Sequence, residues 1–434
     1  MHIYFSGIGG TGIGPLALIA HAAGYEVSGS DKQDSQYITH LRKHGINNIQ
    51  IGQTAEDIAK VHTANPIDWF VYSSALPKEN PNHPEMEFVK SNGIRHSKRD
   101  EFLNHFIADK KLKLIAIAGT HGKTTTTSMV IWLFKQLNLP ISYSVGAKIS
   151  FGEMGTFDSA SQYFAYECDE FDRNFLAFEP ALSIITGVTW DHHEIYPTRE
   201  DYQQAFKEFI SQSHKTLLWQ EDADYLSLLP SVGVVVEDSA VIRADRHKIE
   251  LDGLYNRLDA WLAIKAVHLL TDAKIEELVT LINKFPGLSR RMEEIVPNLY
   301  SDYAHTPEKI NGAMSVALEM SAKSGQKVVI VYEPLTNRRM HFMAKDHENV
   351  FEGASKIYWV PSYLAREDPE SRVLSPQELI GYLSPELRAI AEAAELNTTL
   401  KSTIENHIKS GDMVVCLSGG GGNSLDEWLR KNFI

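Results

Sequence analysis

The feature that most constrains this chain is a glycine-containing loop between an apolar run and a helical pattern. Residues 112–118 are almost wholly apolar, and they lead into Gly119-Thr120-His121-Gly122-Lys123-Thr124-Thr125. Backbone amides in such a turn can cradle a triphosphate, while the Lys123 ammonium neutralises the β and γ phosphates and the Thr124 hydroxyl can ligate Mg²⁺. The loop departs from the standard spacing, because Ile117 occupies the place of its first glycine. We therefore predict an ATP-binding α/β domain whose nucleotide contacts come from residues 119–125.

A second glycine loop stands at the start of the chain. Gly7-Ile8-Gly9-Gly10-Thr11-Gly12 follows an apolar run at 2–5 and precedes an apolar helical pattern at 15–22. Asp31 follows Gly12 by 19 residues, where a carboxylate can accept hydrogen bonds from a ribose or a base. This loop alone indicates a diphosphate and would fit NAD. Two separate phosphate loops favour two phosphorylated ligands, so a simple NAD-dependent oxidoreductase becomes the weaker alternative.

The length and the glycine and proline punctuation indicate three α/β domains in series. A chain of 434 residues suggests about three domains. We place them at 1–107, 108–285 and 286–434, with Pro286-Gly287 opening the third, where apolar runs at 328–332, 357–360 and 413–417 are typical of buried parallel strands. The predicted fold is an N-terminal Rossmann-like domain, a central domain like the P-loop ATPases and a C-terminal Rossmann-like domain.

Composition excludes several classes of partner. The chain carries 42 basic against 56 acidic residues, a formal charge of −14 that argues against binding nucleic acid. Its apolar runs fall short of the ~20 residues that a membrane-spanning helix needs, and the opening residues look like a core strand rather than a signal peptide. Two cysteines cannot build a disulfide framework. We expect a cytoplasmic protein without membrane contact, either a monomer or a homodimer.

The variant loop Gly-Thr-His-Gly-Lys-Thr-Thr-Thr-Thr resembles that of the Mur ligases, which build the peptide of bacterial cell-wall precursors. The likeness runs through nearly the whole chain. It includes the first glycine loop, Ser28-Gly29-Ser30-Asp31, Ser73-Ser74-Ala75, Glu167-Cys168-Asp169-Glu170-Phe171-Asp172, Asp191-His192, Arg290-Arg291, Asp302-Tyr303-Ala304-His305 and Glu333-Pro334. Within the family the chain is most similar to the alanine-adding branch, and the murein tripeptide branch is close to it.

This resemblance implies an activity and a set of ligands. An ATP-dependent ligase of this family joins L-alanine to the lactyl carboxylate of UDP-N-acetylmuramic acid through an acyl phosphate. Negative charge then collects between two anionic partners, so the site needs Mg²⁺ and fixed cations. The implied UDP-sugar contacts are Gly7, Gly9, Gly10, Gly12, Asp31, Ser73 and Ser74, and Asn256 joins the ATP-binding loop.

The resemblance also implies roles at the reaction centre. Thr124, Glu167 and His192 are the expected Mg²⁺ ligands, whereas we expect Asp169, Glu170 and Asp172 to be partly solvated surface and His193 to be structural. Lys123 and Arg291 would stabilise the transferred phosphoryl group, which requires the third domain to close onto the second. His305 and Asp302 are expected at the incoming ammonium, and Arg339 at the carboxylate of the amino acid.

Several departures from the family pattern keep alternatives open. Gly187 replaces an asparagine, and Tyr255 and Asp259 replace the histidine and the second asparagine that frame adenine, which also suits a non-catalytic relative. Leu335 and Thr336 replace a histidine and an arginine near the acceptor, which suits a ligase that adds L-Ala-γ-D-Glu-diaminopimelate tripeptide instead. The segment 361–367, which resembles the Tyr-x-Ala-x-Glu pattern of the alanine-adding branch, favours L-alanine.

Overall fold

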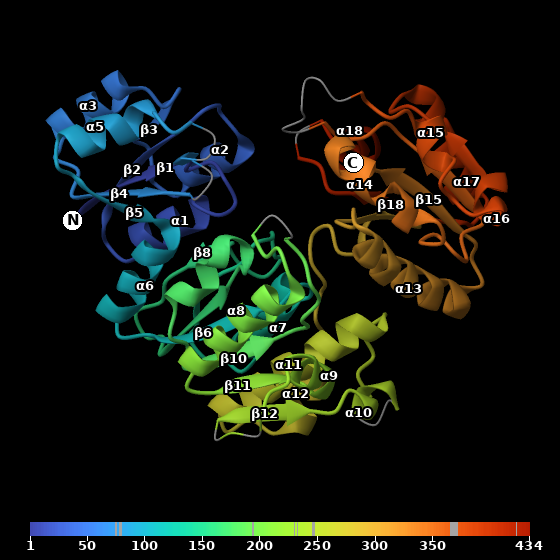
Figure 1. Cartoon of the computed structure of the whole chain (residues 1–434), viewed down its shortest axis with the longest axis horizontal. Helices are drawn as coiled ribbons and strands as arrows, with labels where there is room; N and C mark the ends of the chain where they lie inside the picture. The colour runs from blue at the N-terminus through green and yellow to red at the C-terminus, as the bar shows by residue number, and fades with distance from the viewer. Residues whose placement is uncertain are drawn as a thin grey trace. The chain divides into compact units, whose positions relative to one another are not determined.

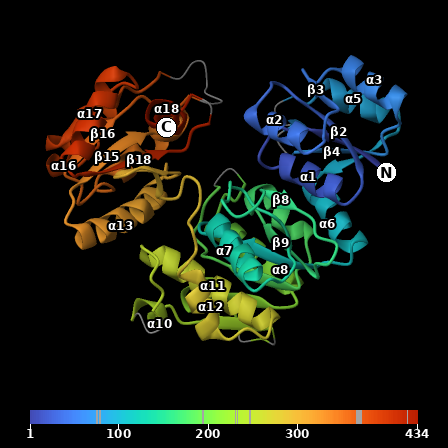
Figure 2. The same cartoon turned by 180° about the vertical axis from the view of Figure 1, so that it is seen from behind.

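The computed structural model describes the whole chain except residues 74–75, 78–79, 193–194, 230, 232, 245–247, 365–371 and 422. Three β-sheets follow one another along the chain, each with helices packed on it (Figures 1 and 2). The elements form two compact units, one made of residues 1–249 and 258–285 and the other of residues 250–257 and 286–434. The first unit holds the first two sheets, and the second unit holds the third sheet. The α/β class that the sequence predicted is confirmed.

The first sheet has five parallel strands in the order β3-β2-β1-β4-β5. All five residues of β1 are buried, because strands flank it on both sides and helices cover both faces of the sheet around it. The strands are β1 His2–Ser6, β2 Glu26–Asp31, β3 Ile49–Ile51, β4 Trp69–Tyr72 and β5 Arg95–Lys98, and the helices between and after them are α1 Gly14–Ala22, α2 Gln36–Lys43, α3 Ala55–Ala64, α5 Pro84–Ser91 and α6 Arg99–Asp109. The order reverses beside β1, where the carboxyl end of an open α/β sheet typically binds its ligand.

The second sheet has seven strands in the order β12-β11-β10-β6-β9-β7-β8, and only the β7–β8 pair is antiparallel. Its strands are β6 Lys113–Ala118, β7 Ser142–Ser144, β8 Gly155–Thr156, β9 Tyr163–Glu167, β10 Leu182–Ile185, β11 Thr216–Trp219 and β12 Val234–Glu237. The helices are α7 Lys123–Gln136, α8 Arg199–Gln212, α9 Gln220–Tyr225, α10 Ala240–Arg243, α11 Leu254–Leu270 and α12 Ile275–Ile282, with a 3₁₀ segment at Phe171–Ala177. Because β6 lies between β10 and β9, the loop after β6 faces the ends of both neighbours.

The third sheet has six strands in the order β13-β14-β18-β15-β16-β17. Its strands are β13 Glu293–Val296, β14 Leu299–Asp302, β15 Val328–Glu333, β16 Lys356–Trp359, β17 Ala391–Ala393 and β18 Met413–Ser418. Its helices are α13 Pro307–Ser324, α14 Asn337–Met343, α15 Pro376–Ile380, α16 Pro385–Ala389, α17 Thr398–Lys409 and α18 Leu425–Phe433. β14, β18 and β15 are parallel neighbours, so their carboxyl ends meet at one edge.

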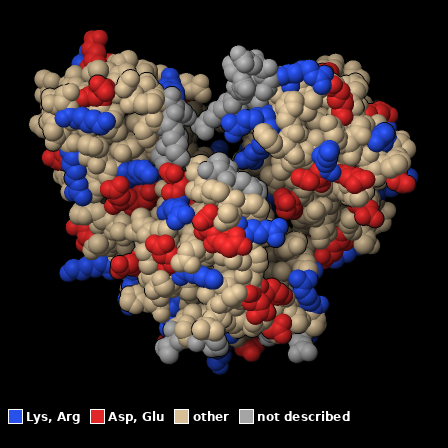
Figure 3. All heavy atoms as spheres, in the orientation of Figure 1, with Lys and Arg blue, Asp and Glu red and all other residues tan. Residues whose placement is uncertain are grey.

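Surface charge and helix hydropathy agree with the composition. Within the described part of the chain, no helix is both long and apolar enough to cross a membrane. On the face drawn in Figure 3, the acidic and basic side chains among the described residues are interspersed rather than gathered by sign.

Candidate active site

The phosphate loop predicted from the sequence joins β6 to α7. Helix α7 begins at Lys123, and no side chain caps it at Gly122. The amides of a helix's first turn have no partner within the helix, so an uncapped N-terminus at the end of a parallel strand is suited to bind a phosphate. Half-buried Thr125 lies in this first turn, after Thr124.

Two glycines are required by the conformation of this loop. Gly119 has φ +141° and Gly122 has φ +79°, a region that side chains other than glycine rarely adopt. A Cβ atom on Gly119 would collide with the Thr186 hydroxyl, and one on Gly122 would lie 2.5 Å from a carboxylate oxygen of Asp259. Thr120 fixes the loop to its neighbour, because its amide donates to the Gly187 carbonyl at 2.8 Å.

Lys123 is held inside the loop by two oxygens. Its ammonium donates to the Gly119 carbonyl at 2.6 Å and to the Glu170 carboxylate at 2.7 Å. Burial favours the neutral form of Lys123, but the carboxylates of Glu170, Asp169 and Glu167 outweigh it and raise the pKa of the ammonium. The lysine is therefore charged and already positioned at the start of α7.

Glu170 is the buried anion of this site. Only 1% of its surface is exposed, and burial alone would raise the pKa of its carboxyl. Lys123 and His192 overcome that effect and lower the pKa of Glu170 to about 2. Its second oxygen, Oε1, makes no hydrogen bond. The expectation that Glu170 is partly solvated surface is therefore wrong, because this carboxylate is enclosed and paired.

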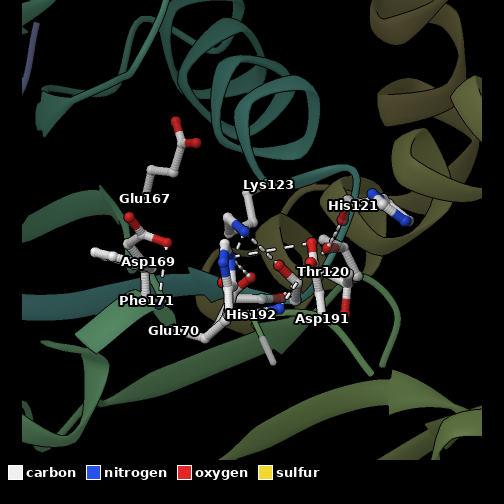
Figure 4. A network of polar contacts seen from close by, with 12 residues as sticks. Thr120, His121, Lys123, Glu167, Asp169, Glu170, Phe171, Asp191 and His192 are labelled. Atoms are coloured by element: carbon white, nitrogen blue, oxygen red, sulfur yellow. Dashed lines mark hydrogen bonds and ion pairs between the residues drawn. The ribbon is translucent and has the colours of Figure 1, made fainter. Parts of the chain in front are cut away.

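His192 lies beside Glu170 in the network of polar contacts that Figure 4 shows. Its Nε2 is 3.5 Å from Glu170 Oε1, and single ligand atoms of Asp169, Glu170 and His192 lie within 4.8 Å of one another. The His192 backbone has φ +54°, a left-handed conformation that costs energy in a residue other than glycine and is common at functional sites. His193 is outside the described residues.

Glu167 and Thr124 form a second group of oxygens in the same site. The Thr124 hydroxyl donates to Glu167 Oε1 at 2.8 Å, and the other carboxylate oxygen accepts from the Gly146 amide at 3.0 Å. In Figure 4 the Glu167 carboxylate points away from His192. The structure thus brings Thr124 and Glu167 together, but it groups His192 with Glu170 and Asp169.

The first glycine loop is built around β2. The amides of Gly7 and Ile8 donate to the Ser30 carbonyl, and the Gly9 amide donates to Asp31 Oδ2 at 2.8 Å. Asp31, expected to meet a ribose or base, thus also stabilises the loop. Gly10 closes the turn by donating to the Gly7 carbonyl at 3.0 Å.

An arginine that the sequence did not single out adjoins this loop. A Cβ atom on Gly12 would collide with the Arg99 guanidinium, whose Nε is buried without a hydrogen bond. Arg99 also lies 3.9 Å from Asp169, beside the second phosphate loop. Ser73, another expected UDP-sugar contact, is half-buried just after β4, and Ser74 lies outside the described residues.

Asn256 and Asp259 lie on the same helix, α11, near its start. The Asn256 side chain donates to the Asp252 carbonyl at 2.7 Å, and residues 250–257 belong to the second compact unit. Asp259 is buried against Gly122, so a carboxylate adjoins the phosphate loop where the family has an amide. Tyr255 is 63% exposed.

Asp302 ends β14 in the third sheet, and His305 lies three residues beyond it. Asp302 accepts from the Met292 amide at 2.8 Å, and burial raises the pKa of its carboxyl to about 6. His305 is buried with its Nδ1 unbonded, next to Gly419 at the end of β18. Burial and the charges of Lys309 and Arg339 lower the pKa of His305, so its imidazole is neutral at pH 7.

The two expected arginines of the second unit differ in their surroundings. Arg291 lies over the ring of Tyr303, with its guanidinium carbon 5.3 Å from the ring centre. Arg339 is an exposed residue in the first turn of α14. A run of glycines begins at Gly419, directly after β18 ends at Ser418, and a Cβ atom on Gly420 would collide with the Tyr363 ring. The rest of the segment used to favour L-alanine, residues 365–367, lies outside the described residues.

Glu333 ends β15 as a buried carboxyl whose Oε1 accepts from the Leu425 amide at 3.0 Å. Burial raises the pKa of Glu333 to about 7, so the folded state binds this proton more tightly than the unfolded chain, where a glutamate titrates near 4.3. The stability this proton contributes is complete below about pH 4.3 and is lost as the pH rises through 7.

We predict that Glu333→Gln, which mimics the protonated acid, is more stable than the wild type at pH 8 by on the order of 3 kcal/mol and nearly equal to it at pH 4. Thermal unfolding at both pH values measures this. Glu352→Gln, which changes an exposed carboxyl of the same unit, serves as the control. If the difference in unfolding free energy between Glu333→Gln and the wild type is the same at pH 4 and pH 8, the prediction is wrong.

Comparison with known proteins places these sites in a family. Residues 2–111 match the family described as "Mur ligase family, catalytic domain", and residues 117–231 match "Mur ligase middle domain". The UDP-N-acetylmuramate–L-alanine ligase of Rickettsia felis is 28% identical over 477 residues, covering 99% of this chain and 96% of that protein. The ligase of the same name from Renibacterium salmoninarum is 28% identical, with 96% and 93% covered.

Solved structures resemble this fold over its full length. The crystal structure of the UDP-N-acetylmuramate–alanine ligase of Thermotoga maritima has a TM-score of 0.77 at 22% identity, covering 99% of this chain and 98% of the other. The murein peptide ligase of Psychrobacter arcticus has a TM-score of 0.64 at 21% identity, with 100% and 99% covered. At these identities the likeness concerns the fold.

Proposed function

This chain belongs to the Mur ligase family, and on that premise we propose that it is the ATP-dependent ligase that joins L-alanine to the lactyl carboxylate of UDP-N-acetylmuramic acid. One observation carries the proposal. The uncapped start of α7, the pre-positioned Lys123 ammonium and the Glu167 carboxylate at the end of β9 lie together in one site. Full-length similarity to ligases of that name supports the choice of substrates. We place the reaction in the cytoplasm, where nucleotide-linked precursors are made.

The residues of the loop fit a nucleoside triphosphate bound with Mg²⁺. The free amides at the start of α7 suit phosphate oxygens, and the Thr124–Glu167 pair offers the hard oxygen donors that Mg²⁺ prefers. Bound ATP supplies the phosphoryl group that activates the sugar carboxylate. Lys123 neutralises charge on that group, and His192, beside the unbonded oxygen of Glu170, is our candidate for holding a second Mg²⁺.

The second compact unit offers groups for the incoming amine. His305 is neutral, buried and unbonded at Nδ1, so its imidazole can accept a hydrogen bond from the incoming ammonium and position it. Asp302, with a pKa of about 6, is the nearby carboxyl that can assist it. We assign Arg339 to the amino-acid carboxylate and Arg291 to the transferring phosphoryl group.

The first glycine loop is the proposed site of the UDP-sugar. Its glycines keep side chains away from the turn, so a diphosphate can approach the backbone at the start of α1, where no side chain caps the helix. Arg99 supplies a cation beside Gly12, and we add it to the residues proposed to contact the UDP-sugar.

Phosphate release in the presence of ATP, Mg²⁺ and UDP-N-acetylmuramic acid tests the acceptor. We expect L-alanine to give the highest kcat/KM among single amino acids, with glycine and serine slower but measurable, because one methylene discriminates by only about 1–3 kcal/mol. Consumption of the L-Ala-γ-D-Glu-diaminopimelate tripeptide with L-alanine ignored would replace the alanine assignment by that of a tripeptide ligase. No phosphate release with any acceptor would point to a non-catalytic relative.

The same assay tests Arg339. Arg339→Ala should raise the KM for the amino acid by tenfold or more and change the KM for ATP little, because a guanidinium–carboxylate pair is lost only at the acceptor. Arg338→Ala removes the neighbouring exposed arginine of α14 as a matched control. An equal effect of both substitutions would exclude a specific role for Arg339.

A further inference from the structure

Two histidines and a glutamate form a polar cluster outside the proposed active site. Among the described residues, two groups of side chains are arranged so that they can hold a metal ion, and one of them is Asp169, Glu170 and His192. The other consists of His40 and His44 at the end of α2 and Glu153 in the segment between β7 and β8. All three residues belong to the first compact unit. His40 and His44 lie between strands of the first sheet, whereas Glu153 lies between strands of the second.

The donor atoms of this cluster are close to the spacing of a metal's ligands. His40 Nε2 lies 2.8 Å from Glu153 Oε2, His44 Nε2 lies 3.5 Å from Glu153 Oε1, and one ligand atom from each residue lies within 4.8 Å of the others. A tetrahedral Zn²⁺ with bonds of about 2.0–2.1 Å separates its ligand atoms by about 3.3 Å. Small side-chain movements therefore suffice to bring all three donors onto one ion.

Helix geometry and a backbone hydrogen bond prepare the two imidazoles. Residues i and i+4 share one face of a helix, so His40 and His44 lie side by side with their ring centres 4.3 Å apart. His44 Nδ1 bonds to the backbone carbonyl of His40 at 2.9 Å, and a carbonyl only accepts, so the proton lies on Nδ1. This fixes the tautomer with a free lone pair on Nε2, the arrangement usual for metal-bound histidines.

The Glu153 carboxylate contacts both histidines and attracts a nearby cation. It lies 2.8 Å from His40 Nε2 and 3.5 Å from His44 Nε2, and it favours the charged form of Lys135 on α7. The Glu153 side chain is 44% exposed, and those of His40 and His44 are 34% and 39% exposed. The cluster is thus accessible from solvent and partly shielded by protein.

We propose that His40, His44 and Glu153 bind a divalent transition-metal ion of the zinc class. Two imidazoles and one carboxylate suit Zn²⁺, whereas Mg²⁺ prefers oxygen ligands throughout. The ion takes the place of the hydrogen bond between His40 Nε2 and Glu153 Oε2 and leaves its remaining coordination positions to water. It joins α2 of the first sheet to the segment before β8 of the second sheet, so it acts as a cross-link within the first unit. The proposal does not depend on the ligase reaction.

Zn²⁺ binding at pH 7.5 tests the proposal on the full-length protein. Equilibrium dialysis with millimolar Mg²⁺ present, followed by elemental analysis, gives the number of Zn²⁺ equivalents per chain. The variant with both His40→Ala and His44→Ala should bind one equivalent of Zn²⁺ fewer than the wild type, even if other sites also bind Zn²⁺. Glu153→Gln should raise the dissociation constant of the Zn²⁺ ion at this site by tenfold or more. His96→Ala, which removes an exposed histidine of β5 outside the cluster, should leave the number unchanged.

Thermal unfolding supplies an independent measurement. Zn²⁺ that binds the folded state raises the unfolding temperature, so the wild type should gain a Zn²⁺-dependent shift that the double variant lacks. With a chelator present, both proteins should unfold at similar temperatures, which excludes misfolding of the variant. If the double variant and Glu153→Gln both bind as many equivalents of Zn²⁺ as the wild type, with the same affinity, the site does not exist.

Discussion

Lys123→Ala should lower turnover by about a hundredfold to a thousandfold or more while leaving affinity for the UDP-sugar nearly unchanged. Lys123 is the cation fixed at the start of α7, and its ammonium already lies in the phosphate loop, held by Gly119 and Glu170. Removing one preorganised group that stabilises transition-state charge typically costs this much in kcat. The UDP-sugar is assigned to the first glycine loop, so its dissociation constant should change little. Single-turnover phosphate transfer and UDP-sugar binding are the two measurements.

This substitution also leaves Glu170 without its cation, so a loss of stability has to be separated from a loss of chemistry. The double variant Lys123→Met with Glu170→Leu removes both charges and should unfold near the wild-type temperature, because an apolar replacement of a buried ion pair is often neutral. It should remain inactive. Lys135→Ala, at the other end of the same helix, is the control and should keep most of the activity. Activity of Lys123→Ala within a few-fold of wild type would exclude the proposed role.

Local sequence patterns were sufficient to predict the three sheets and both phosphate loops. A buried strand, a glycine turn and an apolar helix are all encoded by consecutive residues, so 112–118 and Gly122-Lys123-Thr124 indicated β6 and the start of α7 correctly. The run at 69–72 corresponds to β4, and the run at 413–417 corresponds to β18. Resemblance to the Mur ligases, which rests on motifs spread along the chain, was confirmed by the family matches.

Long-range packing could not be predicted in the same way. Glu170 lies in an acidic run that has the composition of a solvated surface, and its burial depends on Lys123, 47 residues earlier. Arg99 opens α6 in an ordinary charged segment, yet its guanidinium adjoins Gly12 because the chain folds back beside the first loop. His40 and Glu153 are 113 residues apart and carry no joint motif. The side-chain roles inferred for the second unit, such as those of His305 and Arg339, stay predictions.

The acidic run also yields a large expected change in stability. Glu170→Gln should destabilise the first unit by about 3 kcal/mol at pH 7, because it leaves the buried Lys123 ammonium without the negative charge of its hydrogen-bonded partner. The pKa of Glu170 is lowered to about 2 in the folded state, against about 4.3 when unfolded, so the stability it contributes is present above about pH 4.3 and is lost as the pH falls through 2.

The difference in unfolding free energy between wild type and Glu170→Gln should accordingly be full at pH 7 and shrink steadily below pH 4. Asp169→Asn is the matched control, because this neighbouring carboxylate is 38% exposed and the Lys123 ammonium donates to Gly119 and Glu170 instead, so its loss should cost less than about 1 kcal/mol. Chemical denaturation across this pH range, followed by a probe in the first unit, measures both. Should Glu170→Gln be as stable as Asp169→Asn at pH 7, the ion pair does not hold the loop, and Lys123 must be positioned by the loop backbone alone.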